Sequence, residues 1–419
     1  MDELGVVQMF KSKKKINKTY FQKLTQDLQQ HGTAMPQLIV DIDALKQNIG
    51  QVVQMLVSSN ALHSKQHTQQ LQPRLVVKSL ACIELLQIIV KQFQTQGLSC
   101  DRFMVFHAVH LDAVLQAFPD ADILLGKPMP AKVVTDFYAN FPHYRQSNIQ
   151  WLVDSKARLQ QYLEITKQHS KQYNLQLKVN IEIDVGLHRG GVTTDSEMRQ
   201  LLQLIDANPQ HLQFTGLMGY DAHVAKIPTI LQSMDVSYQQ SQTIYQNYQQ
   251  LIKAEFPTLW QEDLCFNGAG SPTFALHCQQ SVCNDLSFGS MVLKPSDFDL
   301  KTLQNFQSAL WIATPVLKVL PFSQIPGFPM LDRLPHRKQA VFVYGGYWMA
   351  DYHYPQGTTP HALYGRSSNQ EMVQIPKSSV AVDDYVFLRP HQSEAVIPQF
   401  SMIYAYQAGQ FQAWQTLRE

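Results

Sequence analysis

Short apolar runs alternate with longer amphipathic stretches along the first two thirds of this chain of 419 residues. The runs are bounded by Gly, Pro, Asp or Asn, which is typical of buried parallel strands, and the stretches between them have helical periodicity. Such alternation predicts an α/β fold with right-handed crossovers and a parallel sheet. The nine predicted strands are residues 38–40, 75–77, 103–106, 123–125, 151–153, 177–183, 214–218, 264–266 and 286–288.

The number of predicted strands leaves two architectures open. Nine strands are one more than a closed (β/α)8 barrel needs, and a doubly wound open sheet is the competing arrangement. Periodicity does not separate the two, because both bury parallel strands between helices.

After about Asp299 the pattern changes to that of a mainly-β domain. A Pro- and Gly-rich segment at residues 321–335 is followed by short strand candidates and tight turns. The candidates are residues 340–344, 385–388, 402–406 and 411–414, with turns at 383–384 and 408–409. We therefore expect a helical extension over residues 1–34, an α/β domain over 35–299 and a β domain over 300–419.

Composition excludes several classes of protein. The chain has 34 Lys and Arg against 33 Asp and Glu, and a net charge of +1 provides no general field for nucleic acid or anionic lipid. No apolar stretch approaches the ~18 residues of a membrane-spanning helix. The basic run Lys11–Lys15 follows the first apolar residues, the reverse of a secretory signal, and five cysteines without a CxxC pattern are typical of a reducing compartment. We expect a cytoplasmic protein with no nucleic-acid or membrane partner.

Lys78 is the first residue that could carry chemistry. It ends the apolar run 75–77 and precedes a helix predicted to begin near Ser79. Active sites of parallel α/β folds gather at the carboxyl ends of strands, and a partly desolvated lysine there can form a Schiff base with an aldehyde. The alternative is a lysine that merely extends past a strand end into solvent.

The segment from Asn267 to Thr273 follows a predicted strand and is rich in small residues. Such residues let backbone N–H groups approach a phosphate, and the hydroxyls of Ser271 and Thr273 add donors. The segment lacks the lysine of a P-loop and the spacing of a dinucleotide-binding fingerprint. A simple tight turn is the alternative.

Two further strands end in polar side chains. Glu182 and Asp184 alternate along one strand, which runs into His188 and Arg189, and Arg189 could hydrogen-bond an acidic or phenolic oxygen. The carboxylates could instead pair with basic neighbours. The strand at 214–218 runs into Tyr220, which could stack on a flat ring or be an ordinary aromatic residue at a barrel mouth.

Taken in order, these motifs resemble those of a known family. The series runs from residues 39–45 and Asn48 through Arg74-x-x-x-Lys78-Ser79, Glu182-x-Asp184-x-Gly186-x-x-Arg189-x-Gly191, Gly216–Tyr220, Gly268–Thr273, Phe288-Gly289-Ser290 and Tyr344-Gly345-Gly346-Tyr347 to Leu388–Glu394. It is similar to the fold-type III pyridoxal-phosphate enzymes of the alanine racemase type, and most of all to their D-threonine aldolase/D-serine dehydratase-like branch. The resemblance covers roughly residues 35–415.

This resemblance implies a fold and a cofactor site. The fold is a (β/α)8 TIM barrel followed by a β domain, to which the first strand near residues 37–41 belongs. Lys78 is implied to carry pyridoxal 5'-phosphate as an internal aldimine, with Arg189 near the cofactor's phenolic oxygen and Tyr220 near the ring face. The residues implied to hold the phosphate are Gly268, Gly270, Ser271 and Thr273.

One departure from the family concerns a metal. Metal-dependent members of the branch carry His-x-Cys or His-x-Asp near the end of the chain, whereas here His391 is followed by Ser393, a poor ligand for a divalent ion. Glu394 is adjacent, but on an extended strand its side chain would point to the opposite face from that of Ser393. Either no divalent metal binds, which we expect, or a different set of residues binds it.

The implied activity is that of an enzyme acting on a small D-amino acid, above all a D-hydroxy amino acid, by aldol cleavage or by dehydration and deamination. The alternatives are an amino-acid racemase, a non-catalytic pyridoxal-phosphate-binding protein, and an unrelated phosphate-binding barrel. A racemase needs a second base opposite Lys78, for which Tyr344 and Tyr347 are candidates, and His391 is a candidate acid for a leaving β-hydroxyl. All three could instead be packing or rim residues. Enzymes of this type close the site with the β domain of another subunit, so a homodimer is expected.

Overall fold

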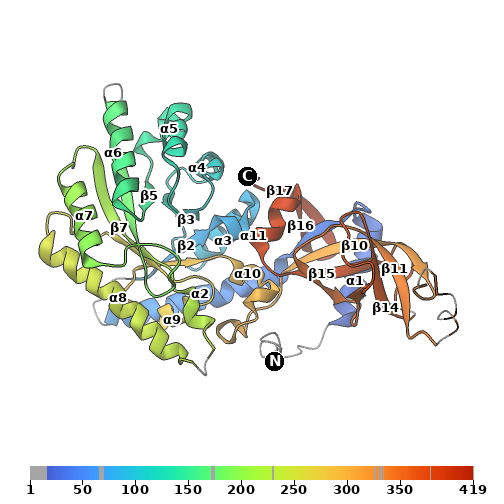
Figure 1. Cartoon of the computed structure of the whole chain (residues 1–419). Coiled ribbons are helices and arrows are strands. Elements are labelled where there is room, and N and C mark those ends of the chain that lie inside the picture. The colour runs from blue at the N-terminus through green and yellow to red at the C-terminus, as the bar shows by residue number, and fades with distance from the viewer. Residues whose placement is uncertain are drawn as a thin grey trace. The chain divides into compact units, whose positions relative to one another are not determined.

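Eight parallel strands close into a barrel in the computed structural model, with neighbours in the order of the sequence (Figure 1). The closed barrel confirms the (β/α)8 architecture and excludes the open sheet. Most residues of these strands are buried, which explains why they form continuous apolar runs in the sequence. The strands are β2 (Gln72–Val76), β3 (Arg102–Val105), β4 (Asp122–Leu125), β5 (Ile149–Val153), β6 (Leu177–Ile183), β7 (Leu212–Gly219), β8 (Cys265–Gly268) and β9 (Asp285–Phe288).

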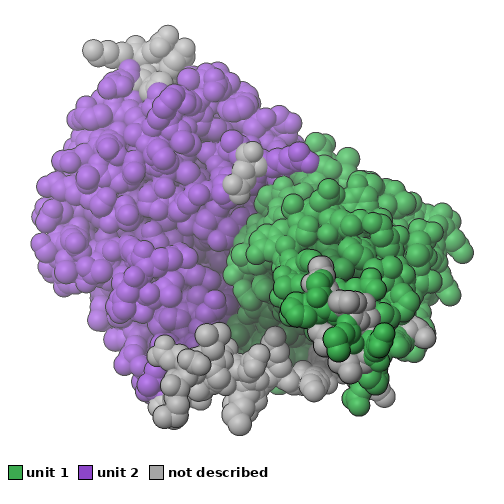
Figure 2. Space-filling model, turned by 45° about the vertical axis from the view of Figure 1, so that its right-hand side comes forward, with its two compact units in different colours: residues 1–47, 292–416 green, residues 48–291, 417–419 purple. Residues whose placement is uncertain are grey.

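The structure describes residues 17–65, 70–170, 175–228, 231–324, 327–328, 330, 333, 335–377 and 379–418. The chain divides into two compact units, which Figure 2 shows in different colours. The barrel unit contains residues 48–291 and 417–419, and the β unit contains residues 1–47 and 292–416. The second boundary falls at residue 291, whereas the sequence pattern changes near Asp299.

Helices on the outside of the barrel cover its strands (Figure 1). Each buries one apolar face, as in α3, where Leu86, Ile89 and Phe93 are fully buried. In α7, a capping box of Thr194 and Glu197 satisfies the first backbone N–H groups. The main helices are α2 (Ile42–Lys65), α3 (Ile83–Gln94), α4 (Leu111–Ala117), α5 (Ala131–Asn140), α6 (Lys156–Ser170), α7 (Asp195–Asp206), α8 (Met234–Glu255) and α9 (Phe274–Gln279).

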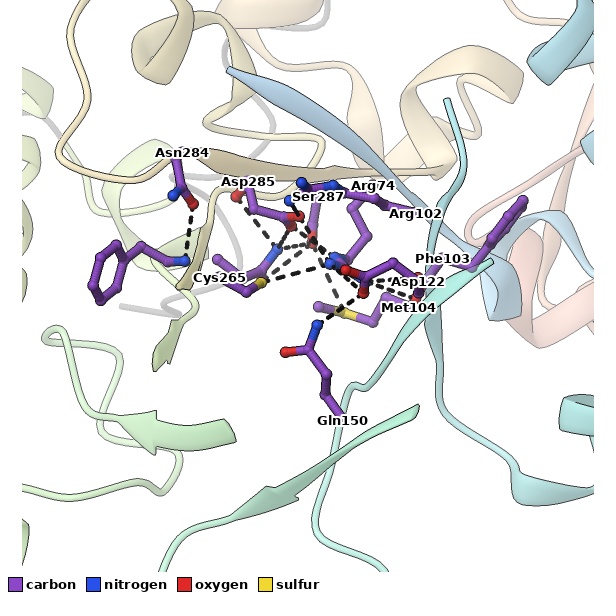
Figure 3. A network of polar contacts seen from close by, with 12 residues as sticks. Arg74, Arg102, Phe103, Met104, Asp122, Gln150, Cys265, Asn284, Asp285 and Ser287 are labelled. Atoms are coloured by element: carbon purple, nitrogen blue, oxygen red, sulfur yellow. Dashed lines mark hydrogen bonds and ion pairs between the residues drawn. The ribbon is translucent and has the colours of Figure 1, made fainter. Parts of the chain in front are cut away.

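A network of charged side chains fills the interior of the barrel near the amino-terminal ends of its strands (Figure 3). The Arg74 guanidinium is fully buried and contacts the Asp285 carboxylate at 2.7 Å and the Asp122 carboxylate at 3.0 Å. Arg102 contacts the other oxygen of Asp285 at 2.8 Å. Burial opposes ionisation of Asp285, but the charges of Arg74 and Arg102 and their hydrogen bonds outweigh it and lower the pKa of this carboxyl. Two arginines and two aspartates make the network electrically balanced.

The β unit is built on one mixed sheet, and one of its inner strands comes from the amino-terminal part of the chain. Strand β1 (Gln37–Asp41) pairs antiparallel with β10 (Leu310–Leu320) and parallel with β16 (Met402–Gln407). The first predicted strand therefore belongs to this sheet and not to the barrel, as the resemblance implied. The other strands are β11 (Lys338–Tyr344), β12 (Ala350–Tyr354), β13 (Thr359–Pro360), β14 (Gln370–Pro376), β15 (Tyr385–Pro390) and β17 (Gln410–Gln415).

Helix α1 (Lys18–His31) packs on this sheet. Its apolar side chains Phe21, Leu24 and Leu28 are buried in one cluster with Ile39 and Trp311. The helix lies within the segment predicted to form a helical extension, of which residues 1–16 are outside the described residues. No helix in the described ranges combines the length and apolar content needed to cross a membrane.

Several elements of the β unit differ from the sequence prediction. Strands β10, β12, β13 and β14 are not among the predicted strands. In β14, buried residues alternate with less buried polar ones, so the strand does not form an apolar run. Ser393 was expected on an extended strand, but it begins the short helix α11 (Ser393–Val396). The prediction that the Glu394 side chain points to the opposite face from that of Ser393 is therefore wrong, because it assumed an extended strand.

Candidate active site

The predicted site residues of the barrel unit follow the carboxyl ends of its strands. Lys78 follows β2, Arg189 follows β6, Tyr220 follows β7, and residues 269–273 form the β8–α9 loop. Because all eight strands are parallel, these segments leave the barrel at the same end. Active sites of such barrels gather at this end.

Lys78 lies in a short 3-10 helix, Val77–Leu80, and its amine contacts an aromatic ring. The Nζ atom is 3.8 Å from the centroid of the Phe106 ring, a cation–π arrangement. Phe106 is held in turn by Gly126, where an added Cβ would come within 2.4 Å of the Phe106 ring. Phe106 and Gly126 were not predicted as site residues, although Phe106 ends one predicted strand and Gly126 directly follows another.

Arg189, Tyr220 and Gly270 come together in the structure. The Arg189 guanidinium carbon is 4.9 Å from the centroid of the Tyr220 ring. A Cβ added to Gly270 would lie 2.5 Å from Cε2 of Tyr220, so only glycine leaves room for this ring. Three segments that follow β6, β7 and β8 therefore meet around one tyrosine.

The loop that carries Arg189 is shaped by a carboxylate. Asp184 Oδ1 accepts the backbone N–H groups of Gly186 at 2.9 Å and His188 at 3.0 Å, and Oδ2 lies 2.8 Å from the His188 ring. Burial raises the pKa of the neighbouring Glu182, an effect that the charge of Arg189 opposes. Asp184 thus has a structural partner, and its role is to fix the loop.

A cleft of about 870 Å³ lies beside this loop, at the start of α8. An added Cβ at Gly186 would be 3.0 Å from Nε2 of His223, and burial lowers the pKa of this histidine. The cleft contains none of the predicted site residues. Its lining includes Val185, Gly186, His188, His223, Gln239 and Thr243.

In the β8–α9 loop, Ser271 has both lone pairs engaged. Its nearly buried hydroxyl oxygen accepts the backbone N–H groups of Gly289 at 3.2 Å and Met291 at 3.1 Å. The hydroxyl hydrogen is therefore the part of Ser271 that can be given to a ligand. The preceding Ala269 has a φ of 64°, a left-handed conformation that turns the backbone sharply after β8.

Thr273 has a different environment from Ser271. Its side chain is fully buried, and its hydroxyl donates to Oδ1 of Asp221 at 2.6 Å. The other oxygen of Asp221 lies 2.9 Å from Nε2 of His277. Asp221 and His277 were not predicted from the sequence as residues that support Thr273. A signal existed, because Asp221 directly follows Tyr220 and His277 lies one helical turn after Thr273.

The other predicted site residues belong to the β unit. Tyr344 ends β11, and its carbonyl accepts a hydrogen bond from the Thr314 hydroxyl. Tyr347 is 67% exposed, with the Arg366 guanidinium 5.7 Å from its ring centroid. His391 follows β15, and its Nε2 lies 3.1 Å from Asp351.

Ser393, at the position of a metal ligand in the metal-dependent members, and the adjacent Glu394 follow His391 in the sequence. The Ser393 side chain is fully buried, and its hydroxyl lies 3.3 Å from an oxygen of Glu394. Within the described ranges, no group of three or more His, Cys, Asp or Glu residues is arranged to hold a metal ion. All five cysteines lie within those ranges, and each is a buried free thiol.

Comparison with known proteins identifies the barrel. The model of the family described as "Alanine racemase, N-terminal domain" matches residues 40–296. No curated protein sequence is significantly similar to the chain.

Solved structures share the whole fold. D-threonine aldolase from Filomicrobium marinum has 16% sequence identity and a TM-score of 0.66 over 91% of this chain and 97% of that one. D-threo-3-hydroxyaspartate dehydratase from Delftia sp. HT23 has 17% identity and a TM-score of 0.64 over 92% and 97%. Alanine racemase from Bacillus anthracis has 14% identity and a TM-score of 0.66 over 91% and 97%. At these identities the likeness is one of fold.

Proposed function

The chain belongs to the family of the alanine racemase N-terminal domain, the barrel of the fold-type III pyridoxal-phosphate enzymes, and from this premise we propose that it binds pyridoxal 5'-phosphate and acts on a small D-hydroxy amino acid. The reaction we propose is aldol cleavage or dehydration with deamination. The observation that carries the proposal is the meeting of Arg189, Tyr220 and Gly270 at the barrel end from which Lys78 also projects. The names of two structural neighbours, a D-threonine aldolase and a D-threo-3-hydroxyaspartate dehydratase, support the choice of substrate class.

The residues present fit the cofactor. A primary amine, a guanidinium and a hydroxyl with a free hydrogen form a donor set for an aldehyde, a phenolic oxygen and a phosphate, respectively. Gly270 leaves the backbone open where a Cβ would collide with Tyr220. Lys78, Arg189, Tyr220, Gly268, Gly270 and Ser271 would hold the group.

When bound, pyridoxal phosphate supplies an electron sink that weakens the bonds at the Cα atom of an amino acid. The amine of Lys78 would take a proton from Cα or return one to it. Ser271 would donate its hydroxyl hydrogen to the phosphate, because its oxygen already accepts two backbone N–H groups. Arg189, held over Tyr220, would donate to the phenolic oxygen.

His391 is the acid that we propose for the leaving β-hydroxyl. Asp351 lies 3.1 Å from its Nε2 and orients the ring. We propose that no divalent ion takes part, because Ser393 cannot supply the anionic ligand of a two-residue metal site. His391→Ala is expected to slow reaction of D-serine or D-threonine ~100-fold, and dialysis against a strong chelator is expected to leave activity unchanged. Recovery of lost activity by added zinc or manganese would contradict the metal proposal.

We also propose a cytoplasmic homodimer in which the β unit of one subunit covers the barrel mouth of the other. In the β unit, the segments 345–349 and 361–367 are joined by a backbone hydrogen bond from the Gly346 N–H to the Ser367 carbonyl and by the Arg366 guanidinium over the Tyr347 ring. They expose several large apolar side chains, as expected of an interface. A stable interface would exceed ~2,000 Å², so light scattering at micromolar concentration should give twice the mass of 47.9 kDa. The exposed side chains are Tyr347, Met349, Leu363 and Tyr364.

The visible spectrum of purified protein tests the cofactor, and product analysis tests the reaction. We expect a yellow protein whose absorption band is removed by borohydride, with the reduced adduct on Lys78. D-threonine would give glycine and acetaldehyde by aldol cleavage, or a keto acid and ammonia by elimination. Formation of the L-enantiomer would indicate a racemase, which the fold likeness to alanine racemase keeps as the second candidate. Colour without turnover would indicate a binding protein.

A further inference from the structure

A buried carboxylate ties two of the segments that form the site. Asp221 is 2% exposed and directly follows Tyr220 at the end of β7. It accepts the hydroxyl of Thr273 at 2.6 Å with one oxygen and lies 2.9 Å from the His277 ring with the other. Thr273 ends the β8–α9 loop, and His277 belongs to α9. One side chain therefore joins the end of β7 to the end of the β8–α9 loop and to helix α9.

His277 is fixed on every side that the structure describes. Its Nδ1 lies 2.8 Å from the Ser281 hydroxyl, which also accepts the N–H of Cys283 at 3.0 Å. The ring packs edge-on against Tyr238, with 5.1 Å between centroids. Both nitrogens of this buried ring thus have partners, so the ring is held in one orientation and fixes the position of the Asp221 carboxylate.

The His277 ring also packs against Gly268, the residue from which the β8–α9 loop begins. A Cβ added to Gly268 would lie 3.2 Å from Cε1 of His277 and 2.5 Å from the sulfur of Cys283. The backbone at Gly268 consequently rests on side chains that Asp221 and Ser281 hold in place. The loop that follows Gly268 is supported at both ends.

Asp221 is ionised in this environment. Burial opposes ionisation, but the charge of His277 and the hydrogen bonds from His277 and Thr273 outweigh it and lower the pKa of the carboxyl. An ionised carboxylate accepts with both oxygens, as the two contacts require.

We propose that Asp221 is a positioning residue for phosphate binding: it takes the hydroxyl of Thr273 and so holds the β8–α9 loop with Ser271 and the loop backbone turned toward the phosphate. Thr273, which the resemblance implied as a phosphate ligand, acts through this bond. Its side chain is fully buried, and its N–H donates to the Gly270 carbonyl at 3.0 Å, which closes the turn. Without Asp221, the Thr273 hydroxyl needs another partner and the turn loses its anchor. The inference rests on the proposed function, because it assumes that the loop binds the phosphate of the cofactor.

The test compares two ligands that differ only in the phosphate. Pyridoxal 5'-phosphate and pyridoxal are titrated into full-length protein stripped of cofactor, and the ratio of their affinities is measured by absorbance. Asp221→Ala and Thr273→Val are each expected to lower this ratio ~10-fold, and the double variant no further, because both remove the same link. Pyridoxal affinity should stay near that of the wild type, and Thr273→Ser should restore the ratio.

A matched control exists on the barrel surface. Asp206 accepts the hydroxyl of Thr258 at 2.8 Å in an exposed pair of the same chemistry. Asp206→Ala should leave the ratio unchanged. If Asp221→Ala does not fold, Asp221→Asn, which removes the charge, provides a milder test together with Thr273→Val.

The other outcomes each count against a stated claim. Equal loss of both ligands, or a lower melting temperature with an unchanged ratio, would show a merely structural role and overturn the inference. A loss in Thr273→Val but not in Asp221→Ala would mean that Thr273 binds phosphate directly, which also overturns it. A wild-type protein that binds neither ligand, or binds both equally, would instead overturn the proposed function.

Discussion

The two ends of the barrel hold their cations in different ways. Near the amino-terminal ends of the strands, carboxylates at 2.7 and 3.0 Å surround the Arg74 guanidinium in a balanced network. At the carboxyl ends, Lys78 lies 3.8 Å from the ring centroid of Phe106, and Arg189 lies 4.9 Å from that of Tyr220. Buried ion pairs with several hydrogen bonds are fixed in one geometry, whereas the attraction between a cation and a ring depends less on direction.

This difference separates stability from binding. A guanidinium enclosed by carboxylates cannot be offered to a ligand without leaving buried charges unpaired. The Arg189 guanidinium, which lies over an aromatic ring, can still donate its N–H groups to a ligand. We expect changes at the amino-terminal end to affect unfolding and changes at the carboxyl end to affect cofactor and substrate. Four measurements test whether the two ends of the barrel differ in this way.

The largest effect is expected from Lys78→Ala. Loss of the amine should abolish the visible absorption band of the bound cofactor and all activity, because no other group is proposed to bond the aldehyde. The melting temperature of the cofactor-free protein should change little. Absorbance spectra, borohydride reduction and thermal melts check this. A Lys78→Ala protein that still forms a borohydride-reducible adduct would exclude this lysine.

Asp285→Ala should have the opposite effect, a loss of stability with little change in cofactor binding. It leaves Arg74 and Arg102 buried without their shared carboxylate, which should cost about 3–5 kcal/mol of unfolding free energy. Protein that does fold should still bind cofactor. Urea unfolding measures the loss, and Asp136→Ala, which breaks the exposed pair with Lys132, should cost less than about 1 kcal/mol. Equal losses in the two variants would show that the interior network contributes no more to the unfolding free energy than an exposed ion pair does.

Arg189→Lys should weaken cofactor and substrate binding about tenfold without changing stability. A lysine keeps the charge but loses the planar fork and the stacking on Tyr220. Titration of cofactor-free protein measures the affinity, and urea unfolding measures stability. A change in unfolding free energy as large as that of Asp285→Ala would remove the contrast between the two ends.

The smallest effect is a pH dependence of the interior network. The pKa of Asp285 is lower in the folded protein than in the unfolded chain, so its pairing stabilises the fold above the unfolded value and is lost as the pH falls through the folded value. The difference in unfolding free energy between wild type and Asp285→Asn should therefore be greatest near neutral pH and shrink below about pH 4. Urea unfolding over this range tests it. A constant difference would show that the charge of Asp285 is not the origin of its effect.

The strands of the barrel could be predicted from the sequence because both of their faces are buried. All eight strands of the barrel, together with β1 of the β unit, are among the predicted strands, with ends shifted by a few residues. Strands β10 and β14 could not be found in this way. Strand β10 is buried in its first part and exposed in its last, and β14 shows its polar face between buried residues. In β14 this alternation breaks the continuous apolar run that the prediction used, and in β10 Pro315 interrupts the apolar residues.

The candidate site was predictable where a single motif carries it and not where distant segments meet. The motifs around Lys78, Arg189, Tyr220 and Gly270 are visible in the sequence. The link from Asp221 to Thr273 joins residues 52 positions apart, and that from Arg74 to Asp285 joins residues 211 apart. No local pattern specifies such pairs, because the closed barrel alone brings them together. The helix at Ser393 was also missed, since a four-residue helix has too few residues to show periodicity.

The position of β1 as an inner strand of the β unit's sheet has a consequence for biosynthesis. Leu38, Ile39 and Val40 are fully buried in the finished protein, and Val40 pairs with Leu310, 270 residues later in the chain. At ~5–20 residues per second, a ribosome needs roughly 15–50 s to synthesise that stretch. During this time the whole barrel emerges while an apolar strand waits for its neighbours, and such a strand can pair with other chains. Nascent chains should therefore depend most on chaperones before β10 has been made.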